Sequence, residues 1–152
     1  METANHKVEV FIDGSLIYTT HEPGAAFEGK PIREAEDAVC HFRSIQEMPQ
    51  EVFAVMSLNG ASKPIKTRWT TVGLLNSNQV HPREVFADPL MDRAASVIVA
   101  HNHPSGKLEA SAEDLALTKR LQQAGDLLGI KVLDHLIVSS AGFISLKQQG
   151  AI

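Results

Sequence analysis

One stretch constrains the fold more than any other: an apolar run that ends in two histidines. Residues 96–100 read Ser-Val-Ile-Val-Ala, and His101-Asn102-His103 follows directly. A short run of β-branched residues like this is typical of a strand buried inside a sheet. The Pro-Ser-Gly at 104–106 predicts that the strand ends there. The chain therefore places two imidazoles at the end of what should be its most buried strand.

Hydrophobic periodicity and turn residues predict alternating strands and helices along the rest of the chain. The expected strands are a hairpin over 8–18 turning at Asp13-Gly14, then 51–58, 65–73, 96–100, 130–139 and 143–146. The expected helices are 34–46, 82–95 with a break at Pro89, and a last one that runs from the N-cap Ser111 to Leu128, with Gly129 after its end. This order predicts an α/β sandwich with a mixed sheet.

The length of 152 residues favours a single domain. Residues 20–31, which contain Pro and Gly, predict a linker. We therefore expect an N-terminal hairpin and linker over 1–30 and the main domain over 31–152.

Charge and cysteine content exclude several classes of protein. The net charge of −4 argues against a general nucleic-acid binder, which needs a basic face, so we expect no tight binding to nucleic acid. The single cysteine, Cys40, allows neither an intramolecular disulfide nor a cysteine-based zinc site, and we expect it to be a small core residue. We see no signal peptide and no run near the roughly 18 apolar residues of a membrane span, so we expect a cytoplasmic protein.

The two histidines predict a metal site together with a residue further along the chain. Residues i and i+2 of a strand point to the same side, so His101 and His103 can converge on one ion. Asp114 lies in the first turn of the next helix, which can fold back over the strand end. Two histidines and one carboxylate form a catalytic zinc set that leaves a fourth position for water, whose pKa the metal lowers to about 7. Ser111, one turn earlier, could donate a hydrogen bond to an oxyanion.

Simpler interpretations exist for each of these residues. An isolated His-x-His is commonly a surface feature, and Ser111-x-x-Asp114 alone is more commonly a helix cap. Capping leaves the paired histidines unexplained, however, and no single structural role covers all four residues. The pair Asp134-His135 lies inside an apolar strand, where a supporting role is favoured over metal ligation.

The same residues resemble the JAMM metalloprotease motif, which is His-x-His, ten residues, then Asp, with Ser three before the Asp. Residues 104–113 fill that gap here. The segments "VHPREVFADPL", "VIVAHNHPSG", "LTKRLQQAGDLLGIKVLDHLIV" and "GFISL" resemble the RadC-like branch of the MPN (JAB) domains over roughly residues 31–148. The resemblance implies a cytidine-deaminase-like α/β/α fold with a bound zinc ion. It also implies metallopeptidase or isopeptidase activity on a peptide or an isopeptide-linked protein.

The JAMM motif also has a glutamate near the start of an early core strand. Glu51, which opens the strand at 51–58, occupies that place, and the resemblance implies that it moves a proton from the water to the leaving amine. By itself, Glu51 could equally be a solvated residue at a strand end. Glu47 and Glu84 are weaker candidates for the same role.

Two other functions compete with a zinc peptidase. Full-length RadC proteins resemble this domain preceded by a helix-hairpin-helix module, whereas the first 30 residues here fit a hairpin and linker better. A DNA-repair-associated protein with little peptidase activity therefore stays an alternative with little direct support. A non-catalytic MPN scaffold is the other, and the complete motif together with Glu51 argues against it. A zinc deaminase would need a Pro-Cys-x-x-Cys segment, which this chain lacks.

Overall fold

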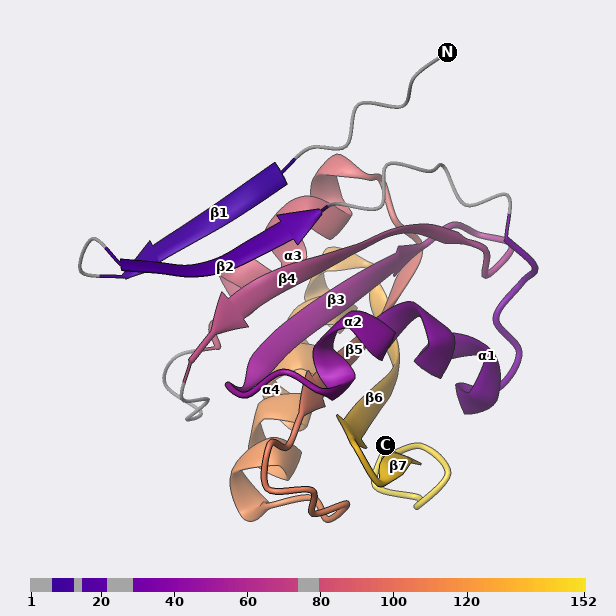
Figure 1. The fold of residues 1–152 in the computed structure, drawn as a ribbon. Helices are drawn as coiled ribbons and strands as arrows, with labels where there is room; N and C mark the ends of the chain where they lie inside the picture. Colours follow the sequence, from indigo (N-terminus) through magenta and orange to yellow (C-terminus); the bar gives the residue numbers. More distant parts are fainter. Residues whose placement is uncertain (1–6, 13–14, 22–28, 74–79) are drawn as a thin grey trace.

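The N-terminal segment forms a small sheet of its own. The computed structural model describes residues 7–12, 15–21, 29–73 and 80–152 (Figure 1). Strands β1 (Lys7–Ile12) and β2 (Ser15–His21) pair antiparallel, as the predicted hairpin requires. Strand β2 extends into the stretch that was expected to be a linker. The turn expected at 13–14 and most of that linker, 22–28, lie outside the described residues.

A mixed five-stranded sheet forms the centre of the main body. Its order is β4-β3-β5-β6-β7. The strands are β3 (Val52–Leu58), β4 (Pro64–Val72), β5 (Ser96–Asn102), β6 (Lys131–Ser139) and β7 (Gly142–Ser145). Strand β5 occupies the middle, antiparallel to β3 and parallel to β6, while β4 and β7 form the edges. The predicted mixed sheet is confirmed.

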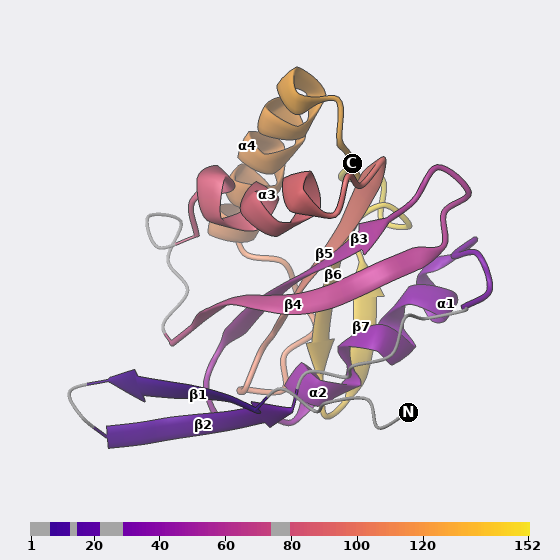
Figure 2. The same ribbon diagram turned by 90° about the horizontal axis from the view of Figure 1, so that it is seen from above.

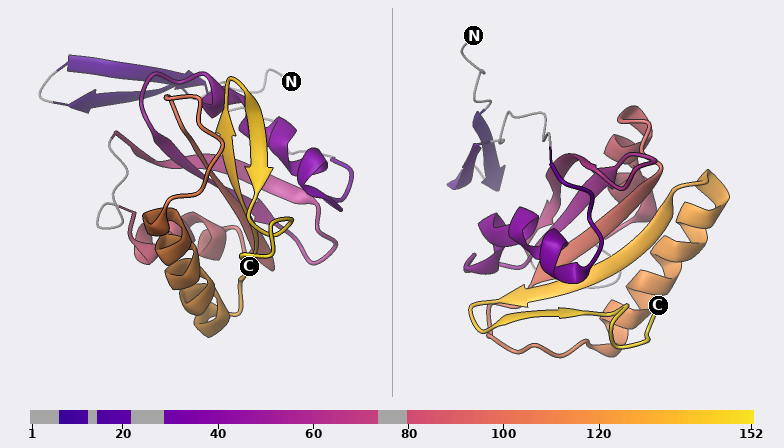
Figure 3. Two further views of the ribbon diagram at one scale, coloured as in Figure 1. Left: turned by 90° about the horizontal axis from the view of Figure 1, so that it is seen from below. Right: turned by 90° about the vertical axis from the view of Figure 1, so that its right-hand side faces the viewer.

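Helices cover both faces of this sheet, which gives the expected α/β/α sandwich (Figure 2). One face carries α1 (Ala35–Val39), the 3₁₀ turn η1 (Cys40–Phe42) and α2 (Arg43–Gln46). The other face carries α3 (Pro82–Met91) and α4 (Ala112–Leu128). Helix α4 connects the parallel strands β5 and β6 and packs along β6 (Figure 3).

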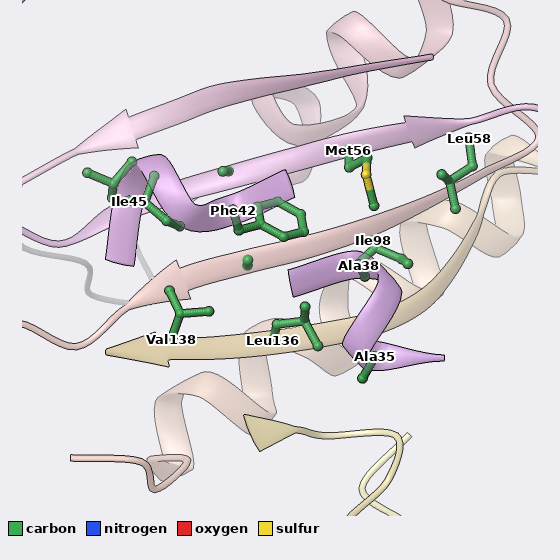
Figure 4. Close-up of a cluster of buried hydrophobic side chains, with 12 residues drawn as sticks. Ala35, Ala38, Phe42, Ile45, Met56, Leu58, Ile98, Leu136 and Val138 are labelled. Carbon is green, nitrogen blue, oxygen red and sulfur yellow. The ribbon is translucent and has the colours of Figure 1, made fainter. Parts of the chain in front are cut away.

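Strand alternation divides the core into two clusters. The first lies under α1 and α2 (Figure 4) and contains Ala35, Ala38, Phe42, Ile45, Val52, Ala54, Met56, Leu58, Ile98, Ala100, Leu136 and Val138. The second lies under α3 and α4 and contains Phe53, Val55, Val80, Val85, Phe86, Val97, Val99, Leu117, Leu121 and Ile130. Even-numbered residues of β5 therefore face α1 and α2, and odd-numbered ones face α4. This parity places His101 on the α4 side.

Several details of the main body differ from the sequence-based expectations. The helix expected over 34–46 is three short pieces, yet it still buries Ala38, Phe42 and Ile45 against the sheet. Cys40 is exposed rather than in the core, and its thiol donates to the carbonyl of Asp37.

Helix α3 runs through Pro89 without the break expected there, and it ends at Met91, short of the expected residue 95. Pro89 removes one backbone donor, which the helix tolerates with the ring buried, and the left-handed φ of +53° at Arg93 then prevents extension toward residue 95. Strand β5 runs two residues further than expected, so that His101 belongs to the sheet rather than to the loop after it. No helix in the described ranges is long and apolar enough to cross a membrane.

Candidate metal centre

His101 is held rigidly at the end of the central strand. Its backbone pairs with Phe53 on β3 and Ile137 on β6, and its side chain is 3% exposed. The imidazole stacks on the ring of Phe53, with centroids 6.2 Å apart and planes 10° from parallel. Neighbouring strands on both sides therefore determine where the ring points.

His103 follows the last residue of β5 and is tied to the loop that leaves the sheet. Its backbone N–H donates to the carbonyl of Val138 at 2.9 Å. Its ring Nδ1 lies 3.0 Å from the carbonyl oxygen of Lys107, which can only accept, so Nδ1 carries the hydrogen. Gly106, with φ of +82°, makes the turn that brings Lys107 back to the ring.

Asp114 reaches the same point from the first turn of α4. The helix begins with a capping box: Asp114 N–H donates to Ser111 Oγ, and Ser111 N–H donates to Asp114 Oδ2. Asp114 Oδ1 lies 3.1 Å from His101 Nε2, and Oδ2 lies 3.6 Å from His103 Nε2. The Nε2 atoms of the two histidines are 2.9 Å apart. The three ligand atoms all lie within 4.8 Å of one another.

This donor set fits a transition-metal ion. Both histidines turn Nε2 toward Asp114 and engage Nδ1 elsewhere, His101 with His135 and His103 with Lys107. Two imidazole nitrogens facing each other beside a carboxylate suit an ion that accepts nitrogen and oxygen ligands together, as zinc does. Magnesium and calcium prefer sites built from oxygen alone.

The electrostatics of the cluster favour a charged aspartate. Burial would raise the pKa of Asp114, but hydrogen bonds with His101 and His103 outweigh it and hold this pKa well below its usual range. Asp114 in turn raises the pKa of His103, against the lowering effect of burial. Complete burial lowers the pKa of His135 well below its ordinary value. Asp114 is therefore an anion at neutral pH, and His135 is a neutral ring.

Ser111 performs the capping role that its spacing predicts. Its Oγ accepts the Asp114 N–H at 3.1 Å, and the residue is exposed beside the ligand cluster. The second role, hydrogen bonding to an oxyanion, stays a prediction. It would use the hydroxyl hydrogen, which the cap does not need.

The sheet register brings Glu51 toward His103. Strand β3 pairs with β5 so that Phe53 faces His101, and in these antiparallel strands Glu51 lies two residues before Phe53 and His103 two residues after His101. After Asp114, the charge of Glu51 is among the causes that raise the pKa of His103. Glu47 instead ends α2, and Glu84 forms an exposed ion pair with Arg83 on α3. Of the three glutamates, Glu51 is thus the one whose charge is seen to act on a residue of the cluster.

Three residues that support the site have no clear motif in the sequence. Asn102, between the two histidines, is fully buried and bonds to the backbone of residues 48, 50 and 52. His135 bonds to His101, and Thr118 bonds to His135. The polar pair Asp134-His135 inside an apolar strand is the one signal that pointed to any of them. Asp134 holds both His135 and the C-terminal turn, because its carboxylate accepts from the His135 N–H, from Ser145 Oγ and from the Lys147 N–H.

Comparisons with known proteins identify relatives across most of the chain. A family described as "RadC-like JAB domain" matches residues 32–151. A "UPF0758 protein" of Methanospirillum hungatei is 55% identical over 101 residues, which are 66% of this chain and 45% of the relative. One from Shouchella clausii is 50% identical over 103 residues, or 68% of this chain and 45% of the relative. One from Bacillus velezensis is 41% identical over 138 residues, or 90% and 58%. The matched region thus spans about half the length of these curated relatives.

Proposed function

Because this chain belongs to the RadC-like JAB domain family, we propose that it is a zinc-dependent metallopeptidase or isopeptidase. The observation that carries the proposal is the convergence of His101, His103 and Asp114 on one point. Two histidines and a carboxylate are a known catalytic zinc set with room for a further ligand. The substrate class would be a peptide or an isopeptide-linked protein.

Each residue of the cluster has a separate task in this proposal. His101, His103 and Asp114 would hold the metal, which when bound supplies a Lewis acid and a readily deprotonated water. Glu51 accepts a proton from the attacking water and delivers it to the leaving amine. Ser111 donates its hydroxyl hydrogen to the oxygen that gains negative charge when the carbonyl is attacked.

Two variants distinguish the residues that would bind the metal from the residue that would transfer the proton. Glu51→Gln keeps the size of the side chain but cannot take up the proton, so peptide cleavage should fall about 10²- to 10⁴-fold with zinc retained. His103→Ala removes a ligand, so zinc and activity should be lost together. The measurements are zinc content of protein purified without chelators and cleavage of quenched peptide and isopeptide substrates.

Four results would contradict parts of this proposal. Failure of the purified protein to bind added zinc would remove the basis of the proposal. Cleavage by Glu51→Gln at the wild-type rate would assign the proton transfer to another residue, with Glu47 and Glu84 next to test. Loss of zinc from a folded Glu51→Gln variant would make Glu51 a ligand. Tight, specific DNA binding at physiological salt, which a net charge of −4 disfavours, would favour the DNA-repair alternative.

A further inference from the structure

A buried line of hydrogen bonds leaves the ligand cluster at His101 and returns to it at Asp114. His101 Nδ1 lies 2.8 Å from His135 Nε2, and His135 Nδ1 lies 2.6 Å from Thr118 Oγ1. Thr118 Oγ1 lies 2.6 Å from the backbone carbonyl oxygen of Asp114. His101, His135 and Thr118 are 2%, 0% and 1% exposed, so solvent does not reach these bonds.

The last bond in the line sets the direction of all the others. A carbonyl oxygen can only accept, so Thr118 donates its single hydroxyl hydrogen to Asp114. Toward His135, the same oxygen can then only accept, which requires a hydrogen on His135 Nδ1. His135 is fully buried with the ring of Phe53 against it, a setting that disfavours a charged imidazole, so with its hydrogen on Nδ1 its Nε2 holds a lone pair and accepts from His101 Nδ1–H. A neutral His101 with its hydrogen on Nδ1 presents a lone pair at Nε2.

We propose that Thr118 and His135 form a relay that holds His101 in the Nδ1–H tautomer, the form in which Nε2 can bind a metal ion. The inference rests on the metal site proposed above. Thr118 and His135 are positioning residues, because they act on the metal through His101 and are not themselves ligands. The relay also uses the helix that supplies Asp114, so one element orients two of the three ligands.

The relay is needed because Asp114 favours the opposite tautomer of His101. With Oδ1 3.1 Å from His101 Nε2, the carboxylate favours a hydrogen on that nitrogen. A reversed relay would satisfy it: Thr118 would donate to His135, His135 Nε2–H to His101 Nδ1, and His101 Nε2–H to Asp114. The reversed form blocks the metal-binding nitrogen. The Thr118 bond to the Asp114 carbonyl is what opposes this reversal.

Removing one hydroxyl should therefore reverse the tautomer. In Thr118→Val, His135 Nδ1–H would be a buried donor without a partner, which is unfavourable. A lone pair at that position costs less, so His135 moves its hydrogen to Nε2 and His101 takes the Nε2–H form. Thr118→Ser keeps the hydroxyl and should keep the wild-type state.

The first test reads the tautomer directly in the metal-free protein. Two-bond ¹⁵N–¹H correlation spectra distinguish Nδ1–H from Nε2–H rings, and His101 is assigned by its loss in His101→Gln. Wild type and Thr118→Ser should show Nδ1–H, and Thr118→Val should show Nε2–H. An Nε2–H ring in the wild type would overturn the inference without the need for any relay variant to fold.

The second test measures zinc affinity by competition with a chromophoric chelator. Partners that orient metal-binding histidines typically contribute 10- to 100-fold, so Thr118→Val should weaken zinc binding by about that factor. Thr118→Ser should stay near wild type. Thr67→Val is the matched control, since this hydroxyl is also buried but lies on β4, opposite Met56. It should leave the affinity unchanged.

A double variant tests whether the two residues act in one line. His135→Phe removes the connection to His101, so adding Thr118→Val should weaken zinc binding no further. Additive losses would overturn the relay. If the wild type binds zinc and Thr118→Val binds it equally well with His101 still Nδ1–H, the relay fails and the proposed function stands. If the wild type binds no zinc, the proposed function fails, and the tautomer spectra still decide the relay.

Discussion

Asn102 shows how a single side chain can connect the metal ligands to the proposed base. It lies between His101 and His103 but faces the opposite side of the sheet. Its Oδ1 accepts the Val52 N–H at 2.6 Å, and its Nδ2 donates to the carbonyls of Met48 and Gln50 at 3.1 and 3.0 Å. These bonds hold the backbone on both sides of Glu51. The segment that carries Glu51 is thereby attached to the strand that carries the histidines.

Asn102→Ala should therefore impair both stability and catalysis. The buried Val52 N–H loses its partner, which costs about 1–3 kcal/mol, and the two carbonyls are only partly buried and add less, so we expect a loss of about 2–4 kcal/mol in the free energy of unfolding. Peptide cleavage should fall while zinc content stays near one per chain. Urea unfolding and zinc analysis check the two effects.

Asn59→Ala is the control for this experiment. Asn59 also accepts two backbone N–H groups, but in the exposed turn before β4. Its loss should cost about 1 kcal/mol and leave cleavage unchanged. Equal stability of Asn102→Ala and the wild type would show that the attachment is unimportant.

The residues predicted from sequence and the residues missed differ in a physical way. His101, His103, Ser111 and Asp114 lie within 14 positions, where strand and helix geometry alone bring them together. The partners of Asn102 lie about 50 positions away, and His135 lies 34 positions from His101. Such contacts depend on which strands are neighbours in the sheet, and periodicity carries no information about that.

At the scale of elements, α4 was predictable because a capping residue and a glycine identify its two ends in the sequence. Ser111 caps the start, and Gly129 takes the left-handed conformation, with φ of +72°, at the end. The first helical segment carries weaker signals, because Glu34 begins it and no glycine ends it. Packing of Phe42 and Ile45 against the sheet then decides its path, and the 3₁₀ turn results.

Gly125 makes the position of α4 dependent on the absence of a side chain. A Cβ at this position would collide with the carbonyl oxygen of Ile130 and lie 3.1 Å from Phe86 Cζ. Gly125→Ala gains about 1 kcal/mol in helix propensity, but overpacking costs about 1–3 kcal/mol, and the contact with the Ile130 backbone places the cost in the upper part of that range. We expect a net destabilisation of about 1–2 kcal/mol in urea unfolding.

Gln123→Ala is the matched control on the same helix. Gln123 is exposed, so its replacement should change stability by no more than about 0.5 kcal/mol. A Gly125→Ala variant more stable than the wild type would mean that α4 can move away from Phe86 at little cost. Such a movement should then also appear as weaker zinc binding, because α4 carries Asp114.

At the scale of the whole molecule, the shifted pKa values of two histidines predict a pH at which the metal-free protein is most stable. Burial lowers the pKa of His135 in the folded protein. Below about pH 6.5 the unfolded chain therefore binds a proton at His135 that the folded protein does not bind, and the folded state loses stability as the pH falls. The pKa of His103 is raised by Asp114, so its contribution is present below about pH 6.5 and is lost as the pH rises through the raised value. Stability should fall in both directions from about pH 6.5.

Urea unfolding with a chelator at pH 5, 6.5 and 8 tests this expectation. The slope for one proton is at most about 1.4 kcal/mol per pH unit. His41, whose pKa burial also lowers, acts in the same direction as His135 on the acid side. His135→Phe should flatten the acid side, and added zinc should raise stability most at pH 8. A wild type more stable at pH 5 than at pH 6.5 would contradict the assignment to His135.

The double use of Asp114 has a consequence for descent within the family. One carboxylate oxygen accepts the Ser111 N–H that starts α4, and the other faces His101. Natural selection for a well-started helix and selection for chemistry therefore act on the same codon. A relative without the proposed hydrolytic activity would still need Asp114 to start α4, whereas His103 has no part in starting that helix. In a diverging relative, we expect His103 to be replaced before His101 or Asp114. Replacement of His103 would then be the better marker of a domain that serves as a scaffold rather than as the proposed enzyme.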